Sequence, residues 1–206
     1  FFVEDGQTFI NTEEGPLPLN IFGRHNLNNL AGAKWICQNM GVDEEDFYEA
    51  ISSFKGASKR LEKIGESGST KIYKDYAHSP SKVAATTRAV KEQVPDRKLI
   101  ACLELHTYSS LNAGFLKEYR GSLNKADVSA VFYIPESLKI KGLDEITKQQ
   151  IGQAFQQEEL HVFTNSAAFK EFLFDQDVAN SVILFMSSGD YGGLDLNEIV
   201  NRIENI

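Results

Sequence analysis

Helical and extended patterns alternate along the chain after residue 79, and this alternation constrains the fold more than any other feature of the sequence. Strands separated by helices predict βαβ units, which build a parallel sheet with helices on both faces. The near-continuous apolar runs at 99–103 and 182–186 fit strands that are buried on both faces. We therefore expect an α/β fold with a mostly parallel, doubly wound sheet. The expected elements are helix 80–94, strand 99–103, helix 112–123, strand 128–133, helix 143–155, strand 160–164, helix 167–174, strand 182–186 and helix 194–203.

The first 58 residues read differently, as extended pieces followed by two helices. Residues 1–22 are broken by Gly6 and by a turn at 13–16, and we expect two edge strands of a larger sheet. One helix runs from Asn29 and is closed by Gly41, and a second begins at the N-cap candidate Asp43. The side chains expected to face inward are Phe47, Ala50, Ile51 and Phe54, and those also expected in the core are Trp35, Phe169, Phe172 and Phe174.

A small, polar connector at 55–58 leads into an expected hairpin of 61–64 and 70–73. We place a domain boundary near residue 58, which gives one domain of residues 1–58 and another of residues 59–206. The chain starts without Met and within a strand pattern, which indicates a piece of a longer protein.

Charge and cysteine usage narrow the class of protein. The 21 basic and 29 acidic residues give a net charge of −8, which repels nucleic acid and anionic membrane surfaces. No apolar run approaches the roughly 20 residues that cross a bilayer, and the first residues lack a secretory signal. Cys37 and Cys102 are too few and too far apart for a disulfide framework or paired zinc ligands. We expect reduced, buried thiols in a cytoplasmic protein.

Three polar clusters follow predicted strands, at 75–79, 104–110 and 187–193. In open parallel sheets, ligands gather beyond the carboxyl ends of the strands. Ser79 is an N-cap candidate and Pro80 suits the first helical position, so free N–H groups are expected to point at an anion there. An ordinary helix cap, with Asp75 and His78 on the surface, would give the same residues.

The segment Asp75-Tyr76-Ala77-His78-Ser79-Pro80 resembles the first strand-to-helix turn of the carboxy-terminal domain in Mur ligases and in the related folylpolyglutamate synthetases. Residues 23–29, Gly-Arg-His-Asn-Leu-Asn-Asn, resemble the family's Gly-x-His-Asn-x-x-Asn segment at the end of its central ATPase domain. Residues 59–62, Lys-Arg-Leu-Glu, resemble the element at the hinge between the two domains. The resemblance implies the tail of a central ATP-binding domain followed by a Rossmann-like carboxy-terminal domain.

The same resemblance implies roles for individual residues. Asp75 lies against the ATP ribose and phosphates, His25, Asn26 and Asn29 contact adenine, and Arg60 reaches ATP across the domain interface. Amide side chains suit a base edge because each one supplies both donors and acceptors. Tyr76 and His78 line the place where an acyl phosphate meets the incoming amine. Without the family, the same residues read as a capped helix start with a satisfied histidine and as a charged strand start.

The remaining two clusters concern the acceptor. Residues 104–110 resemble the His-Arg-Tyr-Thr-Arg element of family members that use L-alanine, but Thr107 and Ser110 replace both arginines. The turn at 186–193 is closer to that of members that join a tripeptide to UDP-N-acetylmuramate. A tight turn that needs glycine for its backbone alone is the other interpretation. By resemblance the substrate-binding residues are Ser79, His106, Tyr108, Ser109, Ser188, Gly189, Asp190 and Tyr191.

The resemblance therefore implies an ATP-dependent amide ligase of peptidoglycan precursors that also uses magnesium. The family's phosphate-binding loop and magnesium carboxylates are expected upstream of Phe1, and no such loop exists in these residues. We accordingly predict no metal ligand here and no turnover by this chain alone. The expected partners are UDP-N-acetylmuramate and an amino acid or short peptide, with no nucleic acid and no membrane. An L-alanine ligase is the alternative, and a nucleotide- or peptide-binding α/β module without catalysis is a third possibility.

Overall fold

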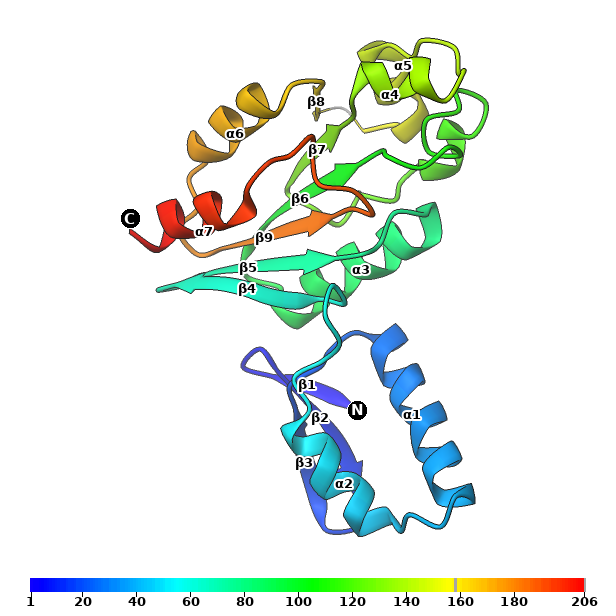
Figure 1. Ribbon diagram of the computed structural model, residues 1–206. Coiled ribbons are helices and arrows are strands. Elements are labelled where there is room, and N and C mark those ends of the chain that lie inside the picture. Colours follow the sequence, from blue (N-terminus) through cyan, green and yellow to red (C-terminus); the bar gives the residue numbers. More distant parts are fainter. Residues whose placement is uncertain (158, 206) are drawn as a thin grey trace.

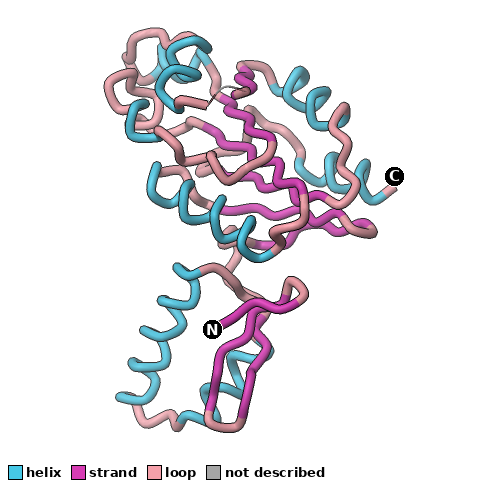
Figure 2. The backbone as a smooth tube through the Cα atoms, turned by 180° about the vertical axis from the view of Figure 1, so that it is seen from behind, coloured by secondary structure: helices cyan, strands magenta, loops and turns pink. Residues whose placement is uncertain are grey.

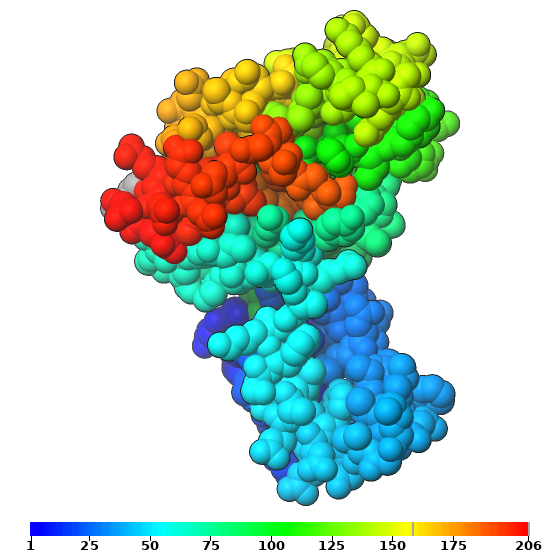
Figure 3. All heavy atoms as spheres, viewed as in Figure 1, coloured from blue at the N-terminus to red at the C-terminus, as the bar shows by residue number. Residues whose placement is uncertain are grey.

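The computed structural model describes residues 1–157 and 159–205 and has two lobes, each with its own sheet (Figure 1). The small lobe contains β1 (Phe2–Glu4), β2 (Gln7–Thr12), β3 (Gly15–Leu19), α1 (Arg24–Asn39) and α2 (Glu44–Ser53). The large lobe contains β4 (Glu62–Ser67), β5 (Thr70–Asp75), α3 (Pro80–Gln93), β6 (Lys98–Glu104), the 3₁₀ helix η1 (Leu116–Tyr119), β7 (Val128–Phe132), α4 (Pro135–Ile140), α5 (Lys148–Phe155), β8 (Leu160–Phe163), α6 (Ser166–Phe174), β9 (Ser181–Met186) and α7 (Leu196–Glu204). Figure 3 shows the lobes meeting at a narrower waist, which the connector (residues 54–61) crosses.

The sheet of the large lobe has the strand order β4-β5-β9-β6-β7-β8. The hairpin of β4 and β5 is antiparallel, and every other neighbouring pair is parallel. The apolar runs at 99–103 and 182–186 form the central strands β6 and β9, and their side chains are buried. This confirms the expected α/β fold with a mostly parallel sheet.

Helices cover both faces of this sheet (Figure 2). On one face, α3, η1, α4 and α5 pack against Leu99, Ala101 and Leu103 of β6. On the other face, α6 and α7 pack against Ile100 and Cys102. Successive residues of β6 therefore alternate between two cores, as the geometry of a strand requires. The expected core residue Phe169 is buried, and Phe172 and Phe174 pack against the second core.

Two expected helices of the large lobe differ from the structure. Residues 105–127, all of which the structure describes, contain the short η1 in place of a helix over 112–123. Turns replace it because the Asn112 side chain accepts the Gly114 N–H, and Gly121 has a φ of 68°. The helix expected over 143–155 begins only at Lys148, after Thr147 and Gln150 form a capping box.

The first strands also differ from expectation. In the part of the chain that the structure describes, β1, β2 and β3 form a separate antiparallel sheet instead of two edge strands of a larger one. Short turns at 5–6 and 13–14 join these strands, so each strand pairs with its neighbour in the sequence. The helix α1 begins at Arg24, five residues before the expected start. The expected cap of α2 is confirmed, since the Asp43 side chain accepts the Asp46 N–H at 2.9 Å.

The small lobe has a small core, and several residues expected inside it are exposed. Its buried cluster consists of Leu19, Leu27, Leu30 and Phe47. Trp35, predicted to be buried, is 67% exposed, and Phe54 and Ala50 are exposed as well. At about 100° per residue, Trp35 lies about 140° around α1 from Leu30. It therefore points away from the face that packs on α2 and the sheet.

The lobes touch where the β1–β2 turn and the start of α1 meet α3. The Gln93 side chain accepts the Thr8 hydroxyl at 2.8 Å and donates to the Gly6 carbonyl at 2.7 Å. Gly23 approaches α3 so closely that a Cβ there would lie 2.7 Å from the Ala89 Cβ. These contacts join the small lobe to α3 of the large lobe.

In residues 1–157 and 159–205, no helix is long and apolar enough to span a membrane. Both cysteines are free thiols, Cys102 buried and Cys37 half-buried. The expected pair of buried thiols therefore holds fully for Cys102 only.

Candidate functional site

A cavity of about 550 Å³ lies between α1, the connector and the first turns of α3. Its apolar lining includes Ile21, Leu30 and Phe54, and its basic lining includes Lys82. All five residues predicted to bind ATP line it: His25, Asn26, Asn29, Arg60 and Asp75. The structure thus brings together segments 23–29, 59–62 and 75–80, which are separate in the sequence.

His25 is the titratable group of the cavity with a shifted pKa. Burial lowers the pKa of His25 from its ordinary value of 6.5, the Asp75 carboxylate raises it, and the guanidinium groups of Arg60 and Arg88 lower it further. The net direction is downward, so the ring is neutral near pH 7. A neutral imidazole offers one donor and one acceptor, which suits the edge of a nucleobase.

Asp75 ends β5 and is 4% exposed. Its carboxylate accepts the Leu61 N–H at 2.8 Å and the Ala77 N–H at 2.7 Å, one on each oxygen. Leu61 itself is held in the left-handed region, with a φ of 49°. The carboxylate therefore fastens the connector to the sheet edge and orders the turn that follows β5, in addition to lining the cavity.

The connector also directs Arg60. Its flanking residue Lys59 has a φ of 57°, and the Lys59 carbonyl accepts the Tyr76 N–H at 2.8 Å. The Arg60 guanidinium carbon lies 5.9 Å from the centre of the Tyr76 ring. Arg60 thus borders both the cavity and the turn that carries Tyr76 and His78.

Tyr76 and His78 lie side by side in the turn between β5 and α3. Their rings meet edge to face, with centres 5.1 Å apart. His78 Nδ1 is 2.8 Å from the Tyr76 carbonyl oxygen. Because a carbonyl only accepts, Nδ1 is the donor in this contact, and Nε2 is then the acceptor nitrogen of the neutral tautomer. The half-buried Ser79 precedes Pro80 at the first helical position, but its side chain makes no capping hydrogen bond.

The backbone of His78 is fixed from the other side by Tyr119 of η1. The Tyr119 hydroxyl donates a hydrogen bond to the His78 carbonyl. Burial raises the pKa of Tyr119 to about 12, so this hydroxyl remains a donor at neutral pH. η1 therefore supports the turn even though it replaces the longer helix expected there.

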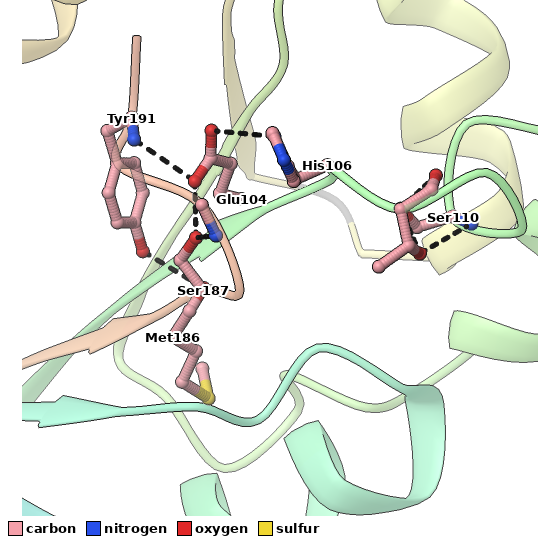
Figure 4. Close-up of polar contacts among 8 residues, drawn as sticks. Glu104, His106, Ser110, Met186, Ser187 and Tyr191 are labelled. Atoms are coloured by element: carbon pink, nitrogen blue, oxygen red, sulfur yellow. Dashed lines mark hydrogen bonds and ion pairs between the residues drawn. The ribbon is translucent and has the colours of Figure 1, made fainter. Parts of the chain in front are cut away.

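The three polar clusters meet because β5, β9 and β6 are adjacent in the sheet. The Ser187 N–H donates to the Asp75 carbonyl at 3.0 Å, which joins the ends of β9 and β5. The Ser187 hydroxyl donates to the Glu104 carboxylate, which joins β9 to β6 (Figure 4). The sequence patterns did not single out Glu104 as a buried residue.

The residues predicted to bind substrate fall into two groups. Those at least partly exposed along this edge are His106, Tyr108, Ser109, Ser188, Gly189 and Asp190, together with Ser79. Tyr191 departs from the expectation, since it is 2% exposed and its ring stacks on Phe169. Its hydroxyl donates to the carbonyls of Cys102 and Met186. The Tyr191 side chain is therefore part of the core and is not available to a substrate.

The turn from Thr107 to Ser110 is satisfied internally. The Thr107 hydroxyl oxygen accepts the Ser110 N–H at 3.2 Å, and the Ser110 hydroxyl donates to the Thr107 carbonyl at 3.0 Å. Ser110 is 1% exposed. The two positions that carry arginine in the resembling element therefore provide no cation at this edge.

Among the residues that the structure describes, no group of three or more His, Cys, Asp or Glu side chains could hold a metal ion.

Comparison with known proteins gives a consistent result. A family profile described as "Mur ligase, glutamate ligase domain" matches residues 59–189. UDP-N-acetylmuramate--L-alanine ligase of Caldicellulosiruptor bescii is 39% identical over 111 residues, which cover 54% of this chain and 24% of that protein. Across several such relatives the chain spans between 15% and 38% of their length.

Two solved structures share the fold. The structure of UDP-N-acetylmuramate-alanine ligase from Thermotoga maritima aligns with a TM-score of 0.68 and 20% identity, over 92% of this chain and 40% of that chain. A murein peptide ligase from Psychrobacter arcticus aligns with a TM-score of 0.62 and 24% identity, over 97% of this chain and 41% of that chain. At these identities the likeness concerns the fold alone.

Proposed function

The chain belongs to the Mur ligase family, and from this we propose that it supplies part of an ATP-dependent amide ligase of peptidoglycan precursor synthesis or recycling. In this proposal residues 1–58 are the end of a central ATP-binding domain, and residues 59–206 are the carboxy-terminal domain. The whole enzyme would join a peptide to the carboxylate of UDP-N-acetylmuramate through an acyl phosphate.

One observation carries the proposal: the five residues assigned to ATP by the family's motifs line a single cavity between the two lobes. Its apolar wall and the amides of Asn26 and Asn29 suit an adenine base. Arg60 and Lys82 supply positive charge where phosphates need it. A nucleotide therefore fits the residues present, whereas magnesium would need ligands from elsewhere in the protein.

We assign the chemistry to the turn beside the cavity. The Nε2 lone pair of His78 and the hydroxyl of Tyr76 are positioned to hold or accept a proton from the incoming amine. In such a ligase the protein contributes mainly by positioning the reactants and stabilising phosphate charge. The fixed Nδ1 tautomer of His78 suits this role.

The acceptor separates two candidates within the family. A short peptide is favoured by the glycine turn at 187–193 and by the absence of arginine from positions 107 and 110. L-alanine is favoured by the name of the Caldicellulosiruptor bescii relative.

Free thiols at Cys37 and Cys102 fit a reducing compartment, so we place the enzyme in the cytoplasm.

Phosphate release by the full-length protein tests the proposal. With ATP, magnesium and UDP-N-acetylmuramate, we expect release when L-alanyl-γ-D-glutamyl-meso-diaminopimelate is added and little with L-alanine. Release with L-alanine alone would identify the second candidate. Nucleotide binding without phosphate release for any amine would indicate a binding module and contradict the ligase assignment.

A further inference from the structure

Glu104 is a buried carboxylate at the centre of the sheet's carboxyl edge. It is the last residue of β6, between β9 and β7, and is 1% exposed. A carboxylate in this position is costly unless donors and charges compensate it. The arrangement around it therefore indicates what it holds in place.

One oxygen of Glu104 is occupied by the β9 turn. Its Oε2 accepts the hydroxyl of Ser187 and the N–H of Tyr191, the latter at 3.0 Å. The Ser187 oxygen in turn accepts the Gly189 N–H at 2.7 Å. Both ends of the turn at 187–191 are thus fixed to one carboxylate (Figure 4).

The other oxygen of Glu104 faces His106. Its Oε1 lies 3.8 Å from His106 Nδ1, and the His106 side chain is 41% exposed. The two groups form an ion pair only when the imidazole is protonated. Glu104 therefore links a buried anchor to an imidazole that reaches solvent at the edge where the acceptor is expected.

Gly189 packs closely against the side chains of both Glu104 and His106. A Cβ at this position would lie 2.7 Å from Glu104 Oε2 and 2.8 Å from the His106 Cγ. The backbone at Gly189 is thus in contact with both side chains, and only glycine leaves room for this approach. The carboxylate, the imidazole and the turn form one packed unit.

We propose that Glu104 is a positioning residue for the acceptor amine, which sets His106 and the turn at 187–191 in a fixed relation at the acceptor side of the site. This inference rests on the proposed function, because it names the part of the ligase that orders the acceptor. Glu104 does not line the cavity between the lobes, where ATP is proposed to bind. Its loss should therefore weaken use of the amine and leave use of ATP intact.

The test uses the full-length protein and the variant Glu104→Gln. Glutamine keeps a carbonyl oxygen for the Ser187 and Tyr191 donors but removes the charge that faces His106. We expect KM for the acceptor amine to rise roughly tenfold or more, as for loss of a charged partner, while KM for ATP stays within about twofold. Ser187→Ala, which removes one anchor of the turn, should change KM for the amine in the same direction.

Ser181→Ala is the matched control. Ser181 is also a fully buried polar residue, but it starts β9 at the opposite end of the sheet, where its hydroxyl donates to the Ala179 carbonyl at 3.1 Å. Ser181→Ala should lower stability without changing KM for the amine or KM for ATP. Thermal melting of all three variants shows which of them fold as the unsubstituted protein does.

Three results separate the outcomes. If the unsubstituted protein releases no phosphate with any amine, the proposed function fails and Glu104 is not the reason. If it is active and Glu104→Gln leaves KM for the amine unchanged, the positioning role is wrong. An equal rise in both KM values, or the same change in Ser181→Ala, would mean that Glu104 only stabilises the fold.

Discussion

At the residue scale, His25 couples the cavity to pH. Its pKa is lowered by burial, so between about 6.5 and its native pKa the unfolded chain binds a proton that the folded chain does not. The free energy of unfolding should therefore fall as pH drops from about 7 to about 5. In urea unfolding, His25→Gln should lose less stability over this range than the unsubstituted chain does.

His161 provides the control for this prediction. It is exposed on the edge strand β8, where its ring lies 4.7 Å from the Phe172 ring, and it is away from the cavity. His161→Gln removes an imidazole that does not line the cavity, so the comparison of the two variants isolates the contribution of His25. An identical pH dependence for His25→Gln would show that burial of His25 does not couple folding to protonation.

The cavity residues can be identified from the sequence, but the anchoring role of Glu104 on the acceptor side cannot. His25, Arg60 and Asp75 belong to motifs with fixed neighbours, so a resemblance could identify them from the sequence alone. The sequence places Glu104 in the polar cluster at 104–110 but does not show that it is buried. Its burial depends on Ser187, which is 83 residues away in the sequence and adjacent only once β9 inserts beside β6. Local patterns carry no information on such a pair.

At the element scale, strands were easier to predict than helices. The strands at 99–103 and 182–186 are buried on both faces, and an uninterrupted apolar run reports that directly. Residues 112–123 have enough apolar side chains for a helix, but the backbone forms local turns at Asn112 and Gly121 instead. Trp35 was predicted to be buried because it lies within a helical pattern. It is exposed because the small lobe covers only one face of α1.

Two glycines of the small lobe should respond oppositely to alanine. Gly23 precedes α1 with φ 86° and ψ 137°, and a Cβ there would meet Ala89 of α3 at 2.7 Å. Gly23→Ala should cost about 1–3 kcal/mol for the backbone strain alone, with the clash in addition. Gly32 lies within α1, and a Cβ there would have nothing within 4 Å, so Gly32→Ala should stabilise by about 0.5–1 kcal/mol.

Urea unfolding of both variants measures the difference, and Gly23→Ala should also loosen the contact between the lobes. A stability loss in Gly32→Ala would mean that this face of α1 is covered in solution. Equal effects at the two positions would contradict the close approach of α1 to α3.

At the scale of the whole molecule, the cavity exists only because the two lobes are held together. The contacts of Gln93 with the β1–β2 turn and of Asp75 with the connector join parts that no periodic pattern relates. A domain boundary near residue 58 could be expected from composition. The backbone path that brings Arg60 into the cavity between the lobes could not. Two left-handed residues, Lys59 and Leu61, set that path, and neither is a glycine that would have marked it in the sequence.

This arrangement leads to a prediction about the chain by itself. The cavity supplies an apolar wall and the positive charges of Arg60 and Lys82, but residues 1–206 contain no phosphate-binding loop. The net charge of −8 also opposes a polyanion. We therefore expect the 206-residue chain to show no turnover and to bind ATP only weakly, with a Kd of about 1 mM, about −4 kcal/mol.

Calorimetry measures this affinity, and Arg60→Ala should weaken it further while Lys139→Ala, on the distant α4, leaves it unchanged. Micromolar affinity in the unsubstituted chain would mean that the cavity between the lobes is a complete nucleotide site, because the chain would then need no further residues to hold the phosphates.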